Sequence, residues 1–365
     1  MIDFLKKNGL KNPTRVKKLI DEAVSFNKLD LRDLVVFTET GSNYYVTTPV
    51  IAAVGGAKKV YAITADSKYG KAIDIEKLTY NFAKFCGIEG KIEVIFEKRP
   101  ELISQADIIT NLGFVRPIDE EFINAMKDTA VIPLMCEAWE CRDRDIDLDA
   151  CNKKGIPVMA TNEGCSGLEV MNFGGNLCLK MLFELDIEVF KSKIVVVSGD
   201  KFGQIIEKYL KAAGAYVKKF DSLKATECRV FLRDADALII ANYTSSDIFV
   251  GMLGHITAEE LINLSPGISV IQFSGIVEIE DLDKYGIPYF PRKKVGSFRM
   301  GATFADLGPK PVIDLHTAGL KVGEIMVRNR FKGQSFKKTI QESLKNPICQ
   351  DFTDEQKKNI ASKWP

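Results

Sequence analysis

Short apolar runs alternate with stretches of helical periodicity along most of this chain, and this alternation constrains the fold more than any other feature. In the first half the runs lie at 34–37, 60–63, 92–96, 107–111, 130–134 and 157–160. Their apolar residues are continuous rather than alternating, which is typical of parallel strands covered by helices on both faces. Strands and helices in alternation connect through right-handed crossovers. The pattern predicts a doubly wound α/β fold.

The same alternation of strand and helix patterns begins again at Ile194. It follows a helix expected at 168–190, which we interpret as the link between two domains. Later strands are expected at 194–197, 216–220, 237–240, 269–273 and 288–290, and a long helix at 318–331. A chain of 365 residues also exceeds one ordinary core. We predict two Rossmann-like doubly wound parallel-sheet domains with an interdomain cleft. The expected bounds are 1–167 for a flavodoxin-like substrate domain completed by a C-terminal helix at 316–340, 168–315 for a Rossmann dinucleotide-binding-like domain, and 341–365 for a peripheral tail.

Composition argues against several classes of function. The formal net charge is +1, from 50 basic and 49 acidic residues, so no electrostatic feature favours nucleic acid or a membrane as a partner. No stretch approaches the ~20 apolar residues that cross a bilayer, and the N-terminus does not resemble a signal peptide. Eight cysteines without C-x-x-C spacing and only two histidines argue against a metal site. We expect a cytoplasmic homodimer with reduced thiols and a small-molecule substrate.

The turn at 198–203 lies between a predicted strand and a predicted helix, where a dinucleotide-binding loop belongs. Asp221 ends the next predicted strand, about 20 residues on, where a carboxylate would hold an adenosine ribose. Ser198 and Asp200 replace the first two glycines of the usual G-x-G-x-x-G, and only Gly203 remains. The predicted cofactor-binding residues, for NAD or NADP, are Ser198, Gly199, Gly203, Asp221 and Asn242.

Asp200 opposes this prediction, because a carboxylate at a helix N-terminus competes with phosphate for the same amides and dipole. Two like charges at ~5 Å cost about 3 kcal/mol at an effective dielectric near 20, enough to weaken binding ~100-fold. A Rossmann-type turn that binds no ligand therefore stays open as an alternative.

An ordered series of segments between about residues 100 and 330 resembles the D-2-hydroxyacid dehydrogenase family. The segments are 104–109, 118–123, 145–158, 236–240, 256–261, 269–273 and 315–319. No single segment is very specific, but their order follows that of the family. The wider fold group includes formate dehydrogenase and S-adenosylhomocysteine hydrolase. The resemblance implies NAD-dependent oxidation or reduction of a small metabolite.

The family's catalytic set is an arginine, a glutamate and a histidine that transfers the proton. His316 in Leu315-His-Thr-Ala-Gly319 matches that histidine, which in the family precedes the returning helix. Ser274 and Gly275 stand where the arginine is expected, and Asp306 is the carboxylate nearest to the place of the glutamate. The resemblance therefore implies catalytic roles for His316 and Asp306. A hydrogen-bonded structural role for His316 stays open.

The segment 35–66 also resembles the opening of a class I methyltransferase, in which a loop after the first strand wraps S-adenosylmethionine. Its loop at 38–43 has one glycine where that family normally has two or three. S-adenosylmethionine is therefore the alternative cofactor, although a plain flavodoxin-like substrate domain fits the segment better.

Polar side chains follow the predicted strands of the N-terminal half, and ligands of α/β sheets bind at these strand ends. Arg116 could hold an anionic group bidentately, or form a surface salt bridge. The acidic segment 136–141 replaces a glycine-rich turn of the family, which favours a cationic or polyhydroxyl substrate. The predicted substrate-binding residues are Glu39, Asn43, Tyr44, Asn111, Arg116 and Glu137.

The function predicted from sequence is a divergent NAD(P)-dependent oxidoreductase of the D-2-hydroxyacid dehydrogenase type that acts on a small polar metabolite. Two alternatives remain. One is an S-adenosylmethionine-dependent methyltransferase or adenosylhomocysteine-related enzyme on the same scaffold, and the other is a non-catalytic nucleotide-binding protein.

Overall fold

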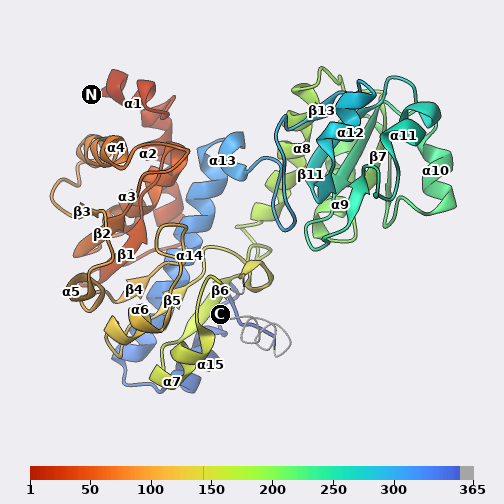
Figure 1. Ribbon diagram of the computed structural model, residues 1–365. Coiled ribbons are helices and arrows are strands. Elements are labelled where there is room, and N and C mark those ends of the chain that lie inside the picture. Colours follow the sequence, from red (N-terminus) through yellow and green to blue (C-terminus); the bar gives the residue numbers. More distant parts are fainter. Residues whose placement is uncertain (143, 354–365) are drawn as a thin grey trace. The chain divides into compact units, whose positions relative to one another are not determined.

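The computed structural model describes residues 1–142 and 144–353, and the chain forms two compact units (Figure 1). The first unit comprises Met1–Val170 and Gly308–Pro365, and the second comprises Met171–Leu307. Each unit is an α/β structure built on a mostly or fully parallel sheet, as the sequence predicts. The cleft expected between them stays a prediction.

The sheet of the first unit contains β1 (Val35–Glu39), β2 (Lys59–Ile63), β3 (Ile92–Ile95), β4 (Ile108–Ile109), β5 (Ile132–Pro133) and β6 (Val158–Thr161). The order β3-β2-β1-β4 continues through a parallel bridge between Ile108 and Val131 to β5 and β6. This is the order 3-2-1-4-5-6 of dinucleotide-binding sheets, whereas the flavodoxin-like order expected from sequence is 2-1-3-4-5. The strand β14 (Cys349–Gln350) pairs antiparallel with β6 at the sheet edge.

Helices cover both faces of this sheet. The helices α5 (Pro100–Ile103), α6 (Glu120–Ala125) and α7 (Leu148–Lys154) share one apolar cluster with Phe37 and Ile109 of the strands. The other helices of the unit are α1 (Ile2–Lys7), α2 (Pro13–Phe26), α3 (Thr47–Val54), α4 (Ala72–Cys86), α14 (Pro309–Phe331) and α15 (Phe336–Ser343). Of these, α2, α3 and α14 pack together, and α14 also contacts β4, β5 and β6 (Figure 1).

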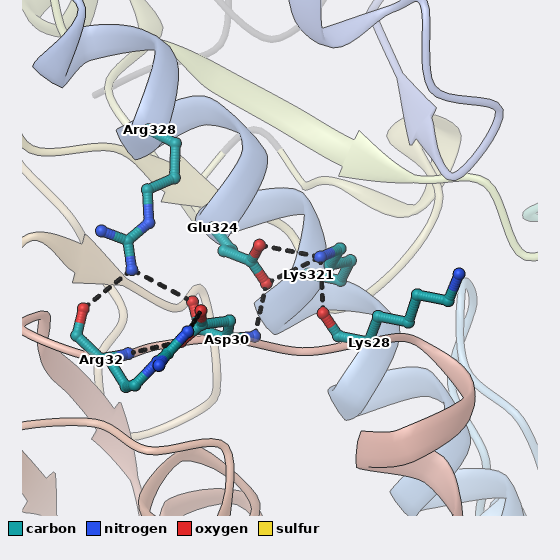
Figure 2. Close-up of polar contacts among 6 residues, drawn as sticks. All are labelled: Lys28, Asp30, Arg32, Lys321, Glu324 and Arg328. Carbon is teal, nitrogen blue, oxygen red and sulfur yellow. Dashed lines mark hydrogen bonds and ion pairs between the residues drawn. The ribbon is translucent and has the colours of Figure 1, made fainter.

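Polar contacts fasten α14 to the segment that joins α2 to β1. Glu324 of α14 accepts hydrogen bonds from the backbone N–H of Asp30 at 2.8 Å and from Nζ of Lys321. Arg328 donates to the carbonyl oxygens of Asp30 and Arg32. A hydrogen bond from a partly buried amide to a charged acceptor contributes more to stability than a surface ion pair. These contacts therefore hold the returning helix in place. Figure 2 shows the six residues of this clamp: Lys28, Asp30, Arg32, Lys321, Glu324 and Arg328.

The sheet of the second unit is parallel and has the order β13-β11-β9-β7-β8. The strands are β7 (Lys193–Val197), β8 (Tyr216–Phe220), β9 (Ala237–Ala241), β11 (Ser269–Ser274) and β13 (Tyr289–Phe290). One face carries α8 (Phe173–Phe183) and α9 (Lys201–Ala212). The opposite face packs against α10 (Thr226–Leu232), α11 (Ala258–Leu264) and α12 (Ile279–Lys284). Two short strands, β10 (Ile248–Val250) and β12 (Ile276–Val277), form a separate ladder, and α13 (Phe304–Leu307) ends the unit.

Two expected helices differ from the structure. The helix expected at 168–190 is a short turn, η3 (Val170–Asn172), followed by α8, which ends at Phe183. Positive φ angles at Asp186 and Val189 turn the chain there, although apolar residues continue the helical pattern. The returning helix begins at Pro309 rather than at 316, because Pro309 and Pro311 lie in its first turn, where proline is tolerated.

The tail expected at 341–365 is not merely peripheral where the structure describes it. It contains the end of α15 and the strand β14, and it belongs to the first unit up to residue 353. Residues 354–365 of that expected tail lie outside the described residues. In the described ranges, no helix is both long and apolar enough to cross a lipid bilayer.

Candidate functional site

The carboxylate of Asp200 lies at the topological switch point of the second unit, between β7 and β9. Asp200 is the N-cap of α9, and its Oδ1 accepts a hydrogen bond from the N–H of Phe202 at 2.9 Å. Its Oδ2 accepts another from the N–H of Tyr243, in the loop after β9, at 2.6 Å. Sheets of this kind bind ligands in the crevice between two such loops. Here one side chain of the protein spans that crevice.

The side chain of Ser198 accepts further hydrogen bonds from backbone N–H groups of this loop. Its Oγ accepts hydrogen bonds from the N–H of Gly203 at 3.1 Å and of Asp200 at 3.3 Å. A Cβ atom at Gly203 would lie 2.3 Å from the Cβ of Ser198, so only glycine fits at this position. The backbone donors of Phe202, Gly203 and Tyr243 thus all have acceptors within the protein. Burial raises the pKa of Asp200, and these hydrogen bonds partly oppose the rise.

The structure brings the predicted cofactor-binding residues into one region. Ser198, Gly199 and Gly203 surround Asp200, and the side-chain amide nitrogen of Asn242 lies 3.4 Å from where a Cβ of Gly199 would be. Asp221 directly follows β8 and has an exposed side chain. Lys219 pairs with it and also donates to the carbonyl oxygen of Ser198. The amides of Phe202 and Tyr243 become available to another acceptor only if Asp200 releases them.

A second carboxylate occupies the equivalent position in the first unit, between β1 and β4. Glu39 ends β1, and its Oε2 accepts a hydrogen bond from the N–H of Phe114, in the loop after β4, at 2.8 Å. Its side chain is buried, and burial raises its pKa, opposed by the Phe114 bond and by the nearby charge of Arg116. In both sheets, a carboxylate therefore accepts a hydrogen bond from the loop across the switch point.

The predicted substrate-binding residues Glu39, Asn111, Arg116 and Glu137 gather at the carboxyl edge of the first sheet. Arg116 donates from Nη1 to Oδ2 of Asp145 at 2.7 Å, which is the salt bridge that the sequence left open. Asn111 accepts from the N–H of Met135 and donates weakly to Sγ of Cys136. Glu137 is buried, caps the turn η2 (Ala138–Glu140) and accepts from Nε1 of Trp139.

Further acidic groups lie beside Glu137. Burial raises the pKa of Glu140, whose side chain is hydrogen-bonded with Glu163 in the loop after β6. Glu163 is 2% exposed. Burial also raises the pKa of the Cys136 thiol well above its usual value, so this cysteine is protonated and a poor nucleophile. The carboxyl groups at this edge are therefore suited to proton transfer, whereas the Cys136 thiol is not suited to nucleophilic attack on a substrate.

Four other predicted site residues make contacts of their own. Asn43 and Tyr44 belong to the turn η1 (Asn43–Val46), and a Cβ on Gly9 would lie 2.7 Å from Oδ1 of Asn43. His316 lies inside α14 rather than before it, is 4% exposed, and shares a 2.6 Å hydrogen bond between its Nδ1 and Oγ1 of Thr48. Burial lowers its pKa to about 4. Asp306 is exposed, caps α13 by accepting from Thr303, and belongs to the other unit.

Several partners in these sites are absent from the sequence-based prediction. Tyr243 and Phe114 contribute backbone amides, which no sequence pattern reveals, because every residue except proline has one. Asp145, which neutralises Arg116, is not among the predicted site residues. Thr48 of α3 is the partner of His316. Among the described residues, no group of three or more His, Cys, Asp or Glu side chains is arranged to hold a metal ion.

No protein-family model matches this chain, and no curated protein matches it in sequence. A dipicolinate synthase chain from Bacillus subtilis is similar in structure, with a TM-score of 0.50 at 11% identity over 83% of this chain and 99% of that chain. The corresponding dipicolinate synthase chain from Bacillus halodurans has a TM-score of 0.47 at 13% identity, covering 82% of this chain and 98% of that chain.

A third similar structure is the NAD-complexed D-isomer specific 2-hydroxyacid dehydrogenase from Lactobacillus delbrueckii ssp. bulgaricus. It has a TM-score of 0.40 at 12% identity, and 82% of this chain and 97% of that chain are covered. At 11% identity, the likeness to the Bacillus subtilis chain shows a shared α/β fold.

Proposed function

We propose that this protein is a divergent NAD(P)-dependent oxidoreductase, on the fold of the D-2-hydroxyacid dehydrogenases, that acts on a small polar metabolite. The proposal rests chiefly on the geometry of the second unit. There, a strand–turn–helix at β7 and α9 is followed by Asp221 at the carboxyl end of the adjacent strand β8. A carboxylate in this place holds the adenosine ribose in dinucleotide-binding sheets. When bound, the nicotinamide ring would supply hydride transfer.

The substrate part of the proposal rests on the carboxyl edge of the first sheet. Glu39, Asn111 and Glu137 converge there with Arg116, and the acidic side chains outnumber the basic one. Because Asp145 already neutralises Arg116, a substrate carboxylate gains little from that arginine. This balance favours a substrate with an amino or several hydroxyl groups over a simple 2-hydroxy acid.

Glu39 is the group that we propose for proton transfer, in place of His316. The imidazole of His316 is buried, neutral and held by Thr48. Glu39 instead lies at a strand end, and burial raises its pKa, which suits a carboxyl group that binds and releases a proton during turnover. The N–H of Phe114 holds one of its oxygens in place.

The test is nucleotide binding by the whole chain, measured by thermal shift and calorimetry with NAD and NADP. A ligand at ten times its Kd stabilises the folded state by about 1.4 kcal/mol, so a rise in Tm at millimolar concentration is expected. Asp221→Ala should weaken the binding at least tenfold, because it removes the acceptor for the ribose hydroxyls. Glu227→Ala, an exposed carboxylate of α10 in the same unit, is the matched control.

Two results would count against the proposal. If neither dinucleotide raises the Tm, the protein does not use NAD or NADP. If Asp221→Ala and the control bind the dinucleotide equally well, Asp221 is not part of the binding site. Turnover is checked by nicotinamide absorbance with a panel of amino and polyhydroxy acids, in the native protein and in Glu39→Gln. Glu39→Gln should lower kcat by about 100-fold or more.

S-adenosylmethionine is the second candidate ligand, and one observation favours it. The Asp200 carboxylate in the loop opposes a pyrophosphate but attracts a positively charged sulfonium group. The same thermal-shift experiment distinguishes the two cofactors, because stabilisation by S-adenosylmethionine without stabilisation by NAD or NADP would favour a group-transfer enzyme.

A further inference from the structure

The three backbone donors at the phosphate end of the second unit are saturated by the protein itself. Phe202 and Tyr243 donate to the two oxygens of Asp200, and Gly203 donates to Ser198. In a dinucleotide-binding turn these are the amides of the helix N-terminus and of the neighbouring loop that face phosphate oxygens. A carboxylate with its two oxygens on two strand-end loops takes the place of such an anion.

This arrangement is supported from several sides. Ser198 donates to Oδ1 of Asp200 at 3.2 Å and also accepts from the Asp200 N–H. The absence of a side chain at Gly203 makes room for Ser198. Lys219 of β8 bonds the carbonyl oxygen of Ser198 and contributes a positive charge that favours the ionised form of Asp200. Asp200 is therefore held in one position rather than free to swing with solvent.

We infer that Asp200 is an internal competitor for the phosphate position and thereby determines which ligands the second unit accepts. The inference rests on the proposed nucleotide site and deepens it. A ligand that carries phosphate at the loop must displace the carboxylate from two amides and approach its negative charge. A ligand with a neutral or positive group at that point meets neither obstacle. Asp200 thus lowers the affinity for dinucleotides and leaves that for unphosphorylated adenosine compounds intact.

The experiment compares the native protein with Asp200→Asn and Asp200→Gly. Asparagine keeps an acceptor for the helix amides, so it removes the charge with little loss of the cap, whereas glycine removes both charge and acceptor. Melting curves of both variants establish that they are folded. Calorimetric titrations with NAD, inorganic pyrophosphate and adenosine then measure the change in Kd. Glu227→Gln removes one negative charge elsewhere on the unit and serves as the control.

The expected result is that Asp200→Asn and Asp200→Gly bind NAD and pyrophosphate about 100-fold more tightly than the native protein, with an unchanged Kd for adenosine. The control should match the native protein for all three ligands. Unchanged or weaker NAD and pyrophosphate binding in both folded variants would overturn the inference, as would an equal gain for adenosine.

The failure of this inference is distinguishable from that of the proposed function. If NAD binds neither the native protein nor the variants, the dinucleotide site itself is absent. Pyrophosphate then still reports on Asp200, because it needs only the vacated amides. If NAD binds the native protein and both variants equally, the protein has a nucleotide site but Asp200 does not compete with phosphate there.

Discussion

Asp200 and Glu39 illustrate how far a single residue can determine the properties of a common fold. Each lies at or just after the end of the first strand of its sheet and bonds a backbone N–H from the loop across the switch point. In both cases burial raises the pKa of the carboxyl group, and the hydrogen bonds from backbone N–H groups oppose the rise. The sequence predicts the conflict between Asp200 and phosphate, since it depends on local spacing alone.

The pH dependence of stability is the prediction that belongs to His316. Its pKa is lowered from 6.5 to about 4, so the folded protein keeps a neutral imidazole while the unfolded chain takes up a proton below pH 6.5. Above pH 6.5 the imidazole is neutral in both states, so the free energy of unfolding has its full value. It decreases as the pH falls from 6.5 toward 4, because only the unfolded chain takes up the proton. At pH 5 the loss is about 2 kcal/mol.

Urea unfolding at pH 7 and pH 5 measures this loss. His316→Gln has no group that titrates in this range, so its stability should fall less between the two pH values, by about 2 kcal/mol. Equal falls in the native protein and in the variant would show that His316 is not buried as a neutral side chain. The sequence alone left this role open, because Thr48 lies 268 residues away.

At the scale of elements, α14 is the helix on which the first unit depends most. It starts seven residues before His316, packs against α2 and α3 and against three strands, and is fastened by the clamp around Glu324. Periodicity predicts most of its length but not its first turns, since Pro309 and Pro311 suggest a loop. Proline at the start of a helix lacks only a hydrogen bond that the first turn does not make.

Glu324→Ala tests the clamp. It removes the acceptor of the Asp30 amide and leaves Lys321 without its carboxylate partner, so a loss of about 2 kcal/mol in unfolding free energy is expected. Glu22→Ala removes an exposed i,i+4 pair with Lys18 and should cost no more than about 0.5 kcal/mol. Denaturant melts of the two variants provide the comparison. Similar losses for both would mean that the clamp contributes no more than a surface ion pair.

At the scale of the whole molecule, the second unit is one continuous segment and the first is not. Residues 171–307 contain a complete five-stranded sheet with helices on both faces. Residues 1–170 lack α14 and β14, which return from the C-terminal part of the chain. The order of strands was beyond sequence analysis, because every buried parallel strand has the same apolar pattern.

Fragments test this division of the chain. The fragment 171–307 should fold by itself, with a cooperative thermal transition and dispersed amide resonances. The fragment 1–170 should not, since removing α14 exposes apolar surface of α2, α3 and the strands. Joining 308–353 to 1–170 through a short flexible linker should restore the transition. A folded 1–170 fragment would contradict the role assigned to α14.

The strand β14 also bears on how copies of this protein behave toward one another. A sheet that stopped at β6 would present a row of unpaired N–H and C=O groups, to which another chain could add a strand. The two residues of β14 cover part of that row, and Pro347 precedes them, where no amide is available for pairing. Deleting this segment would therefore expose an unpaired sheet edge, which promotes aggregation.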